Sequence, residues 1–139
     1  ILQQSAVAFN YEERRKLPWL AQDLGFFNVL PQAGLVVPVQ PIGSLGQLVG
    51  ILYALEGSTL GGQVIYRSLA KHLGLSTDAG ARFFYAYGEA TPARWSDYQA
   101  FADALSGNEP DCLQAEHAAR ETFNHFEQVL EGAAKVVLS

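Results

Sequence analysis

The stretch LGQLVGILYALEGSTLGGQVIYRSLAKHL, residues 45–73, decides how the rest of the chain is interpreted. Its leucines suit the buried side of a long helix, Ser44 is a typical N-cap, and Gly74 is a typical residue just after a helix. The sequence therefore predicts one helix over 45–73. A glycine inside a helix costs about 1 kcal/mol relative to alanine, so the glycines in the middle of this helix need an explanation.

The small residues of this helix recur at i, i+4, i+7 and i+11, which places them in one stripe. They are Gly50, Ala54, Gly57 and Gly61, and Ser58 lies beside them. Two physical interpretations stay open. Small residues four apart allow two helix backbones to pack closely. Alternatively, a flat ligand lies against bare backbone, where any Cβ atom would collide with it. Clustered glycines also allow the helix to kink.

The remainder of the chain predicts more helices and no sheet. The spacing of apolar residues indicates helices over about 1–28, 77–87 and 92–105, and a last helix over about 111–130 or beyond. Three prolines between residues 31 and 41 indicate an ordered loop. The expected fold class is all-α, a compact multi-helix arrangement with a kinked, glycine-rich helix. We expect a single domain over residues 1–139.

Composition and charge exclude several classes of protein. With 49% hydrophobic and 17% charged residues, the chain is too rich in core-forming residues to be disordered. The net charge of -5 argues against nucleic-acid and anionic-membrane partners, because phosphates attract basic patches. The lone Cys112 excludes an internal disulfide and indicates a reducing, cytoplasmic compartment. No apolar run is expected to span a bilayer, since Gln47, Glu56 and Ser58 interrupt the longest.

Familiar catalytic motifs are missing from the sequence, which has no HExxH, no P-loop and no paired-carboxylate pattern. The charged run EERRK, residues 12–16, is interpreted as a solvated helix face with i,i+3 and i,i+4 pairs. Glu56 could help to fix the helix kink or could be solvated. Trp19 and Trp95 are interpreted as core residues.

Four segments resemble the heme oxygenases, in the order in which that family has them. YALEGSTLGGQVI, residues 53–65, is similar to the distal-helix motif, and most similar to the bacterial branch that often accompanies bacteriophytochromes. RRKLPWLAQDLGFF (14–27) resembles the segment before the distal helix. FFYAYGEATPARWSDYQAF (83–101) resembles the connection into the later helices, and ETFNHFEQVL (121–130) resembles the last helix of the pocket.

The resemblance implies a helical domain that holds heme between two helices, with heme as both cofactor and substrate. The implied reaction opens heme with O2 to biliverdin, CO and ferrous iron, using electrons from a ferredoxin or a reductase. A bacteriophytochrome that receives biliverdin is a further implied partner, in a bacterial cytoplasm. The alternative is a non-catalytic helical module that binds heme or another tetrapyrrole, or docks a partner helix on its glycine face.

The resemblance also assigns roles to individual positions. Ser58 stands where many relatives carry an aspartate that organises water, and Gly57 and Gly61 would lie against the ring. Tyr53 and Arg94 are candidate partners of the heme propionates, and Phe123 matches an aromatic residue of the pocket wall. The implied catalytic residues are Gly57, Ser58 and Gly61, and the implied heme-binding residues are Tyr53, Ala54, Gly57, Ser58, Gly61, Gly62, Arg94 and Phe123.

The family's proximal histidine, which ligates the iron, has no counterpart at the expected place. It should precede the segment at 14–15, yet no histidine lies upstream of His72. His72 is roughly 22 Å along the predicted helix from Gly57, and His117 and His125 lie on the last predicted helix. We interpret all three as surface or capping residues. We therefore expect the proximal segment to lie outside this chain, which by itself would hold heme from one side and catalyse little.

Overall fold

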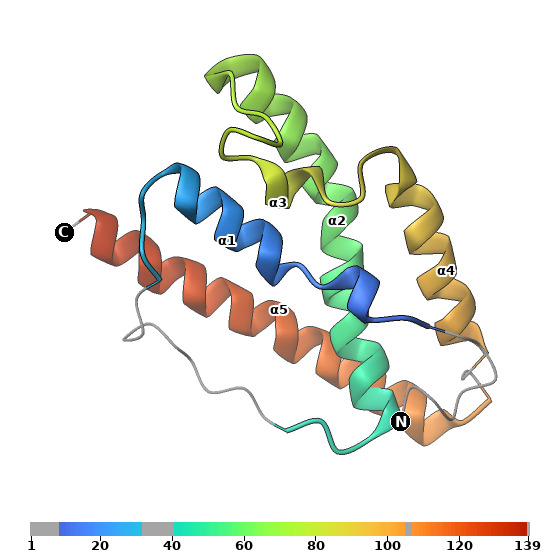
Figure 1. Ribbon diagram of the computed structural model, residues 1–139. Coiled ribbons are helices and arrows are strands. Elements are labelled where there is room, and N and C mark those ends of the chain that lie inside the picture. The colour runs from blue at the N-terminus through green and yellow to red at the C-terminus, as the bar shows by residue number, and fades with distance from the viewer. Residues whose placement is uncertain (1–8, 32–40, 105–106, 139) are drawn as a thin grey trace. The chain divides into compact units, whose positions relative to one another are not determined.

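The computed structural model describes residues 9–31, 41–104 and 107–138. The regular structure of these residues is helical, which confirms the all-α fold class (Figure 1). The elements are the 3-10 helix η2 (Glu12–Arg14), α1 (Leu17–Phe26), α2 (Leu45–Leu73), α3 (Arg82–Tyr85), the 3-10 helix η4 (Gly88–Ala90), α4 (Thr91–Asp103) and α5 (Glu109–Leu138).

Contacts divide the chain into two compact units. The first unit comprises residues 1–31 and 55–104, and the second comprises residues 32–54 and 105–139. Helices α1, α3 and α4 therefore belong to the first unit and α5 belongs to the second, while α2 contributes residues to both. The organisation of residues 1–139 as a single domain stays a prediction.

Helix α2 has the predicted bounds, because both of its ends carry the expected signals. The backbone N–H of Gln47 donates to Ser44 Oγ at 3.2 Å, which is an N-cap hydrogen bond. After Leu73, Gly74 takes a φ of +66°, a left-handed conformation that favours glycine.

By length and composition alone, α2 could cross a membrane, contrary to the expectation that no apolar run is long enough. The core helices of globular proteins pass the same test. Near the middle of α2 the Glu56 carboxylate is 1% exposed and pairs with Arg14 and Lys16. A single helix that passes this test is weak evidence for a membrane span, and charged side chains are costly in a bilayer.

The first unit begins with less helix than predicted. Residues 1–8 of the predicted helix over 1–28 lie outside the described residues, and residues 9–11 precede η2 without helical structure. At Arg15 the backbone is extended, which separates η2 from α1. Pro18 lies in the first turn of α1, where its missing N–H has no partner to lose. Of the predicted proline-rich loop, residues 32–40 lie outside the described residues.

The helix predicted over 77–87 is wrong. The chain turns at residues 76–80, and only Arg82–Tyr85 is helical. Gly80 has a φ of +84°, and a Cβ atom there would lie 2.5 Å from Cζ of Phe27. The Asp23 carboxylate of α1 accepts hydrogen bonds from the backbone N–H groups of Arg82 and Phe83, each at 2.8 Å. This tight turn brings α3 against α1, so a continuous helix cannot form here.

Helix α4, the last helix of the first unit, packs against Phe9 through aromatic side chains. The Phe9 ring stacks on Phe101 with a centroid distance of 4.7 Å and meets Tyr98 edge-on at 6.5 Å. Phe101 and Tyr98 are buried, as their spacing along a helix predicted. The helix runs over Thr91–Asp103, close to the predicted range, whose last residue lies outside the described residues.

In the second unit, the first turns of α2 pack against α5. A Cβ atom on Gly46 would lie 2.5 Å from the backbone oxygen of Asp111, and one on Gly50 would lie 2.1 Å from that of Ala115. Close backbone packing therefore explains the glycines at this end of α2. Helix α5, Glu109–Leu138, begins two residues before the predicted start and continues beyond residue 130, as the prediction allowed.

Candidate functional site

The glycines of α2 within the first unit differ in what surrounds them. At Gly61 an added Cβ atom meets no atom of the described residues within 4 Å. At Gly57 it would be in ordinary contact, 3.6 Å from the indole ring of Trp95. At Gly62 it would lie 3.1 Å from the backbone oxygen of Phe84. The bare-backbone interpretation therefore applies to Gly61, whereas Gly62 is buried against α3 and Gly57 lies beside Trp95.

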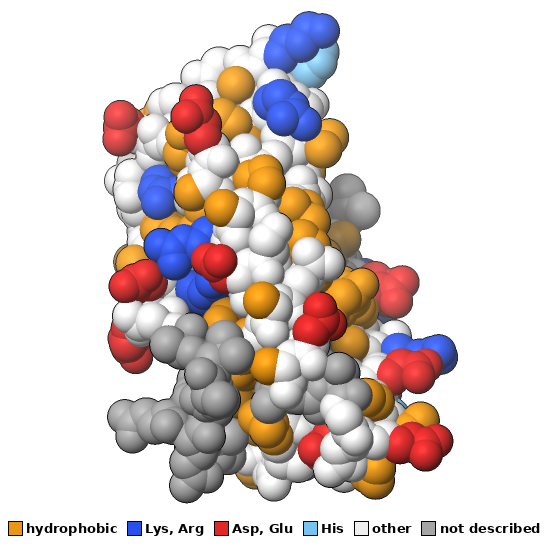
Figure 2. Space-filling view, turned by 90° about the vertical axis from the view of Figure 1, so that its right-hand side faces the viewer, with side chains coloured by type: hydrophobic (Ala, Val, Ile, Leu, Met, Phe, Trp, Pro, Cys, Tyr) orange, Lys and Arg blue, Asp and Glu red, His pale blue; other side chains and the backbone are white. Residues whose placement is uncertain are grey.

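An exposed apolar surface surrounds Gly61. Leu60, Val64 and Ile65 are 39%, 60% and 45% exposed, and helical spacing places them on one face with Gly61. We call these four residues the apolar strip. Hydrophobic side chains also reach the surface elsewhere, as Figure 2 shows for one face of the molecule. A contiguous apolar patch on a helix is typical of a binding surface, and here its centre carries no side chain.

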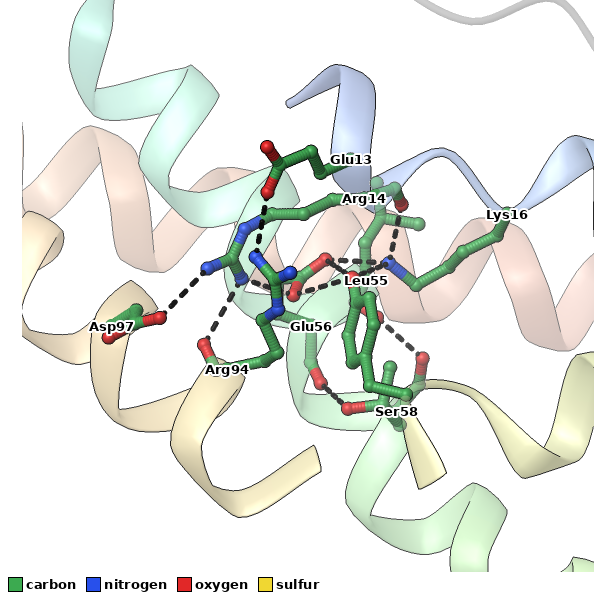
Figure 3. A network of polar contacts seen from close by, with 10 residues as sticks. Glu13, Arg14, Lys16, Leu55, Glu56, Ser58, Arg94 and Asp97 are labelled. Carbon is green, nitrogen blue, oxygen red and sulfur yellow. Dashed lines mark hydrogen bonds and ion pairs between the residues drawn. The ribbon is translucent and has the colours of Figure 1, made fainter. Parts of the chain in front are cut away.

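A buried ion cluster lies on the same helix, directly before Gly57. The Glu56 carboxylate accepts hydrogen bonds from Arg14 NH1 at 2.7 Å and from Lys16 Nζ at 2.6 Å. The Tyr87 hydroxyl lies 3.0 Å from both carboxylate oxygens. Figure 3 shows Arg14 and Lys16 reaching Glu56 from opposite sides. We call Arg14, Lys16, Glu56 and Tyr87 the Glu56 cluster.

The Glu56 cluster corrects the interpretation of residues 12–16. Arg14 and Lys16 are 3% and 12% exposed, so they do not form a solvated face. Only the exposed pair of Glu12 and Arg15, at 3.3 Å, behaves as that interpretation predicted. A signal was present in the sequence, because Glu56 is the one charged residue in the apolar stretch 45–66. A charge in such a stretch needs a partner when it is buried.

The environment of Tyr87 favours its neutral form. Burial of the phenol raises the pKa of Tyr87 above its ordinary value of 10.0, and the negative charge of Glu56 raises it further. The hydrogen bond that the neutral hydroxyl donates to Glu56 acts in the same direction. The hydroxyl therefore stays protonated as a donor to Glu56 above the pH at which an exposed tyrosine ionises.

This pKa shift predicts a pH dependence of stability. The unfolded chain releases the Tyr87 proton near pH 10, whereas the folded chain keeps it, so rising pH favours the unfolded state above that value. The contribution is complete below pH 10 and decreases by up to about 1.4 kcal/mol per pH unit above it. Urea unfolding of the native protein and of Tyr87→Phe gives the difference between their free energies of unfolding. This difference should be smaller at pH 11 than at pH 9. A difference that stays constant would contradict the raised pKa.

Arg94 lies at the outer edge of the cluster. Its backbone oxygen accepts a hydrogen bond from Arg14 NH1 at 3.1 Å, and its side chain pairs with Glu13 at 3.1 Å while remaining one-third exposed. Arg14 also approaches Asp97 at 3.7 Å, and its Nε is buried without a hydrogen-bond partner among the described residues. These residues line a shallow cavity of about 320 Å³ together with Phe9, Asn10 and Ala100.

Ser58 is exposed, but its hydroxyl is engaged within α2. Its Oγ donates to the backbone oxygen of Leu55 at 2.8 Å, a common arrangement for serine in helices. The oxygen lone pairs are left to accept a hydrogen bond from outside. Ser58 can therefore hold a water molecule as an acceptor while its own proton stays with the helix.

The other predicted site residues belong to the second unit. Tyr53 is 48% exposed and lies one turn before Gly57 on α2. Ala54 is fully buried, so it presents no surface to a ligand. Phe123 of α5 is 46% exposed. Their roles at a heme pocket stay predictions.

The three histidines lie on α2 and α5, and the source of the iron ligand stays a prediction. His72 and His117 are exposed, and His125 is half-buried on α5. Within residues 9–31, 41–104 and 107–138, no group of three or more His, Cys, Asp or Glu side chains could hold a metal ion.

These features define an all-α protein in which helix α2 carries both the exposed apolar strip and the buried Glu56. A family model described as heme oxygenase matches residues 39–132. The curated "Heme oxygenase" of Xanthomonas campestris pv. campestris (strain 8004) is 32% identical over 130 residues, which cover 93% of this chain and 75% of that relative. The chain belongs to the heme oxygenase family. The comparison with solved structures found no match.

Proposed function

We propose that the protein is a heme oxygenase that converts heme, with O2 and electrons from a ferredoxin or a reductase, to biliverdin, CO and ferrous iron. The observation that carries this proposal is the open backbone of Gly61 within an exposed apolar strip. In a chain of this family, that strip is the surface on which a flat tetrapyrrole is expected to rest.

The described residues fit heme in shape and chemistry. Heme is a flat apolar disc that carries two carboxylates at one edge, so it needs a low-relief apolar surface with cations nearby. At Gly61 a Cβ atom would stand in open space, where a ring could otherwise approach the backbone. The side chains of Leu60, Val64 and Ile65 extend the apolar contact along α2. The partly exposed Arg94 guanidinium is a cation of the first unit that could pair with a propionate.

Heme supplies both the iron chemistry that activates dioxygen and the ring carbon that is oxidised. The chain's part is binding and orientation. Gly61 lets the ring approach the helix backbone, and the apolar strip excludes bulk water from that side of the ring. Ser58 Oγ, whose proton is held by Leu55, can accept a hydrogen bond from a water molecule and so place a proton donor beside the face. Gly57 contributes backbone surface next to Trp95.

The remaining roles that the resemblance implies are proposals of the same kind. We propose that Tyr53 and Phe123 line the pocket, that the histidine ligand of the iron comes from outside the described residues, and that the protein works in a bacterial cytoplasm. The lone cysteine of the chain is free and exposed at Cys112, which suits a reducing compartment. A bacteriophytochrome is the proposed recipient of biliverdin.

A specific observation also favours a second candidate. The strip is apolar and exposed, so an amphipathic helix of a partner protein could pack on Gly61 as closely as Gly50 packs on α5. That function needs no heme.

Hemin titration separates the two candidates. We expect the purified protein, together with the segment that supplies the histidine ligand of the iron, to give a saturable Soret band. After addition of a reductant and O2 it should give the absorption spectrum of biliverdin. A Soret band without biliverdin would indicate a protein that binds heme but does not degrade it. A protein that shows no Soret change would contradict the heme-oxygenase proposal and favour helix docking.

A further inference from the structure

The position of the Glu56 cluster in the fold suggests a role beyond ion pairing. Its carboxylate acceptor is the residue directly before Gly57, in the middle of the helix that carries the proposed binding face. We infer that Glu56 is a positioning residue, which sets the rotation of α2 so that Gly61 presents its backbone to the substrate and Gly57 stays beside Trp95. This inference rests on the proposed function.

Helix geometry connects the carboxylate to the face. Each residue advances about 100° around an α-helix, so Gly57 lies about 100° and Gly61 about 140° from Glu56. Holding the Glu56 side chain on one flank therefore fixes the direction in which both glycines point. A rotation of α2 that moved this face would have to move the carboxylate away from its donors.

The donors come from separate parts of the first unit. Arg14 ends η2, Lys16 stands directly before α1, and Tyr87 precedes η4. Lys16 Nζ also donates to the backbone oxygen of Arg14 and to the Tyr87 hydroxyl, each at 3.2 Å. Arg14 in turn donates to the backbone oxygen of Arg94 in α4. The carboxylate is thus held by two stretches of the chain, residues 14–16 and Tyr87, which are also joined to each other.

Burial makes this arrangement specific. The carboxylate is 1% exposed, so water cannot replace a lost donor without entering the interior. Buried ion pairs are often no more stabilising than well-packed apolar residues, whereas they do select one geometry in some proteins. We therefore consider a variant that loses one donor to Glu56 but keeps the shape of the side chain. In such a variant we expect the orientation of the α2 face that carries Gly61 to change more than the free energy of unfolding does.

Tyr87→Phe is the variant that removes one donor and keeps the ring. Glu56→Gln is the second variant, and it keeps the shape while removing the charge. Glu12→Gln is the matched control, since it makes the same change in an exposed pair outside the cluster. Each apo-protein is first checked by circular dichroism and thermal melting, so that only folded variants are compared.

Two measurements test the inference on folded protein. In the apo-protein, amide hydrogen exchange over residues 57–65 should rise about tenfold in Tyr87→Phe, while residues 66–73 and the Glu12→Gln control stay unchanged. With hemin, reductant and O2, the distribution of biliverdin isomers should shift and kcat should fall more than KM changes. A purely structural role would lower the melting temperature and leave the isomer distribution as it is.

The outcomes separate this inference from the proposed function. If the native protein gives no Soret band, the proposed function fails, and the exchange measurement on apo-protein still tests whether the cluster holds this part of α2. If folded Tyr87→Phe and Glu56→Gln both keep native exchange over 57–65 and the native isomer distribution, the positioning role is overturned. If Glu56→Gln does not fold, Tyr87→Phe alone decides.

Discussion

Replacing Gly61 with leucine is expected to abolish heme binding while the apo-protein stays folded. An added Cβ atom at Gly61 meets no described atom within 4 Å, so the apo-protein has room for the new side chain. Leucine also favours helix over glycine by roughly 0.5–1 kcal/mol. The same side chain would occupy the surface on which the ring is proposed to lie. We expect hemin affinity to fall at least about 100-fold, which corresponds to roughly 3 kcal/mol.

A matched control distinguishes the effect of covering the proposed binding face from the effect of replacing any glycine in a helix. Gly25 lies in α1, and an added Cβ atom there also meets no atom within 4 Å in the part of the chain that the structure describes. Gly25→Leu should leave the Soret titration unchanged, and Gly61→Ala should give an intermediate affinity. Circular dichroism and thermal melting of each apo-protein check that the helices remain. Native affinity in folded Gly61→Leu would contradict the proposed binding face.

Helix α2 could be predicted from the sequence because its signals are local. Ser44 caps one end, Gly74 leaves the other in a left-handed conformation, and apolar residues fill the turns between them. The helix predicted over 77–87 does not form, because the interaction that prevents it involves a residue far away in the sequence. The Asp23 carboxylate binds the backbone of Arg82 and Phe83 from α1, and a turn through Gly80 satisfies that contact.

The candidate site was predicted in part for the same reason. The stripe of small residues is visible as a periodicity, but the periodicity does not say what covers each position. Gly50 packs on α5, Gly62 packs on Phe84, and Gly61 is open. The Glu56 cluster was missed because Arg14 and Lys16 sit among charged neighbours, so the run resembles a solvated face. Their partner lies about 40 residues further along the chain.

Gly50→Ala should be strongly destabilising, although it adds only a methyl group to the same helix. The new Cβ atom would lie 2.1 Å from the backbone oxygen of Ala115 and 2.9 Å from the Ala118 Cβ. Because the closest obstacle is backbone, no side-chain rotation can relieve the overlap, and α2 must move away from α5. Overpacking of this kind costs about 3 kcal/mol, which should lower the melting temperature by roughly 10 °C in a chain of this size.

Gly132→Ala is the control within the same unit, since an added Cβ atom on α5 there meets nothing within 4 Å. It should hold or raise the melting temperature, because alanine favours helix by up to about 1 kcal/mol over glycine. A Gly50→Ala protein as stable as Gly132→Ala would show that the second unit does not need this close approach. The opposite responses expected at Gly50 and Gly61 follow from one difference. A helix backbone occupies the space outside Gly50, whereas no atom of the described residues lies within 4 Å of a Cβ built on Gly61.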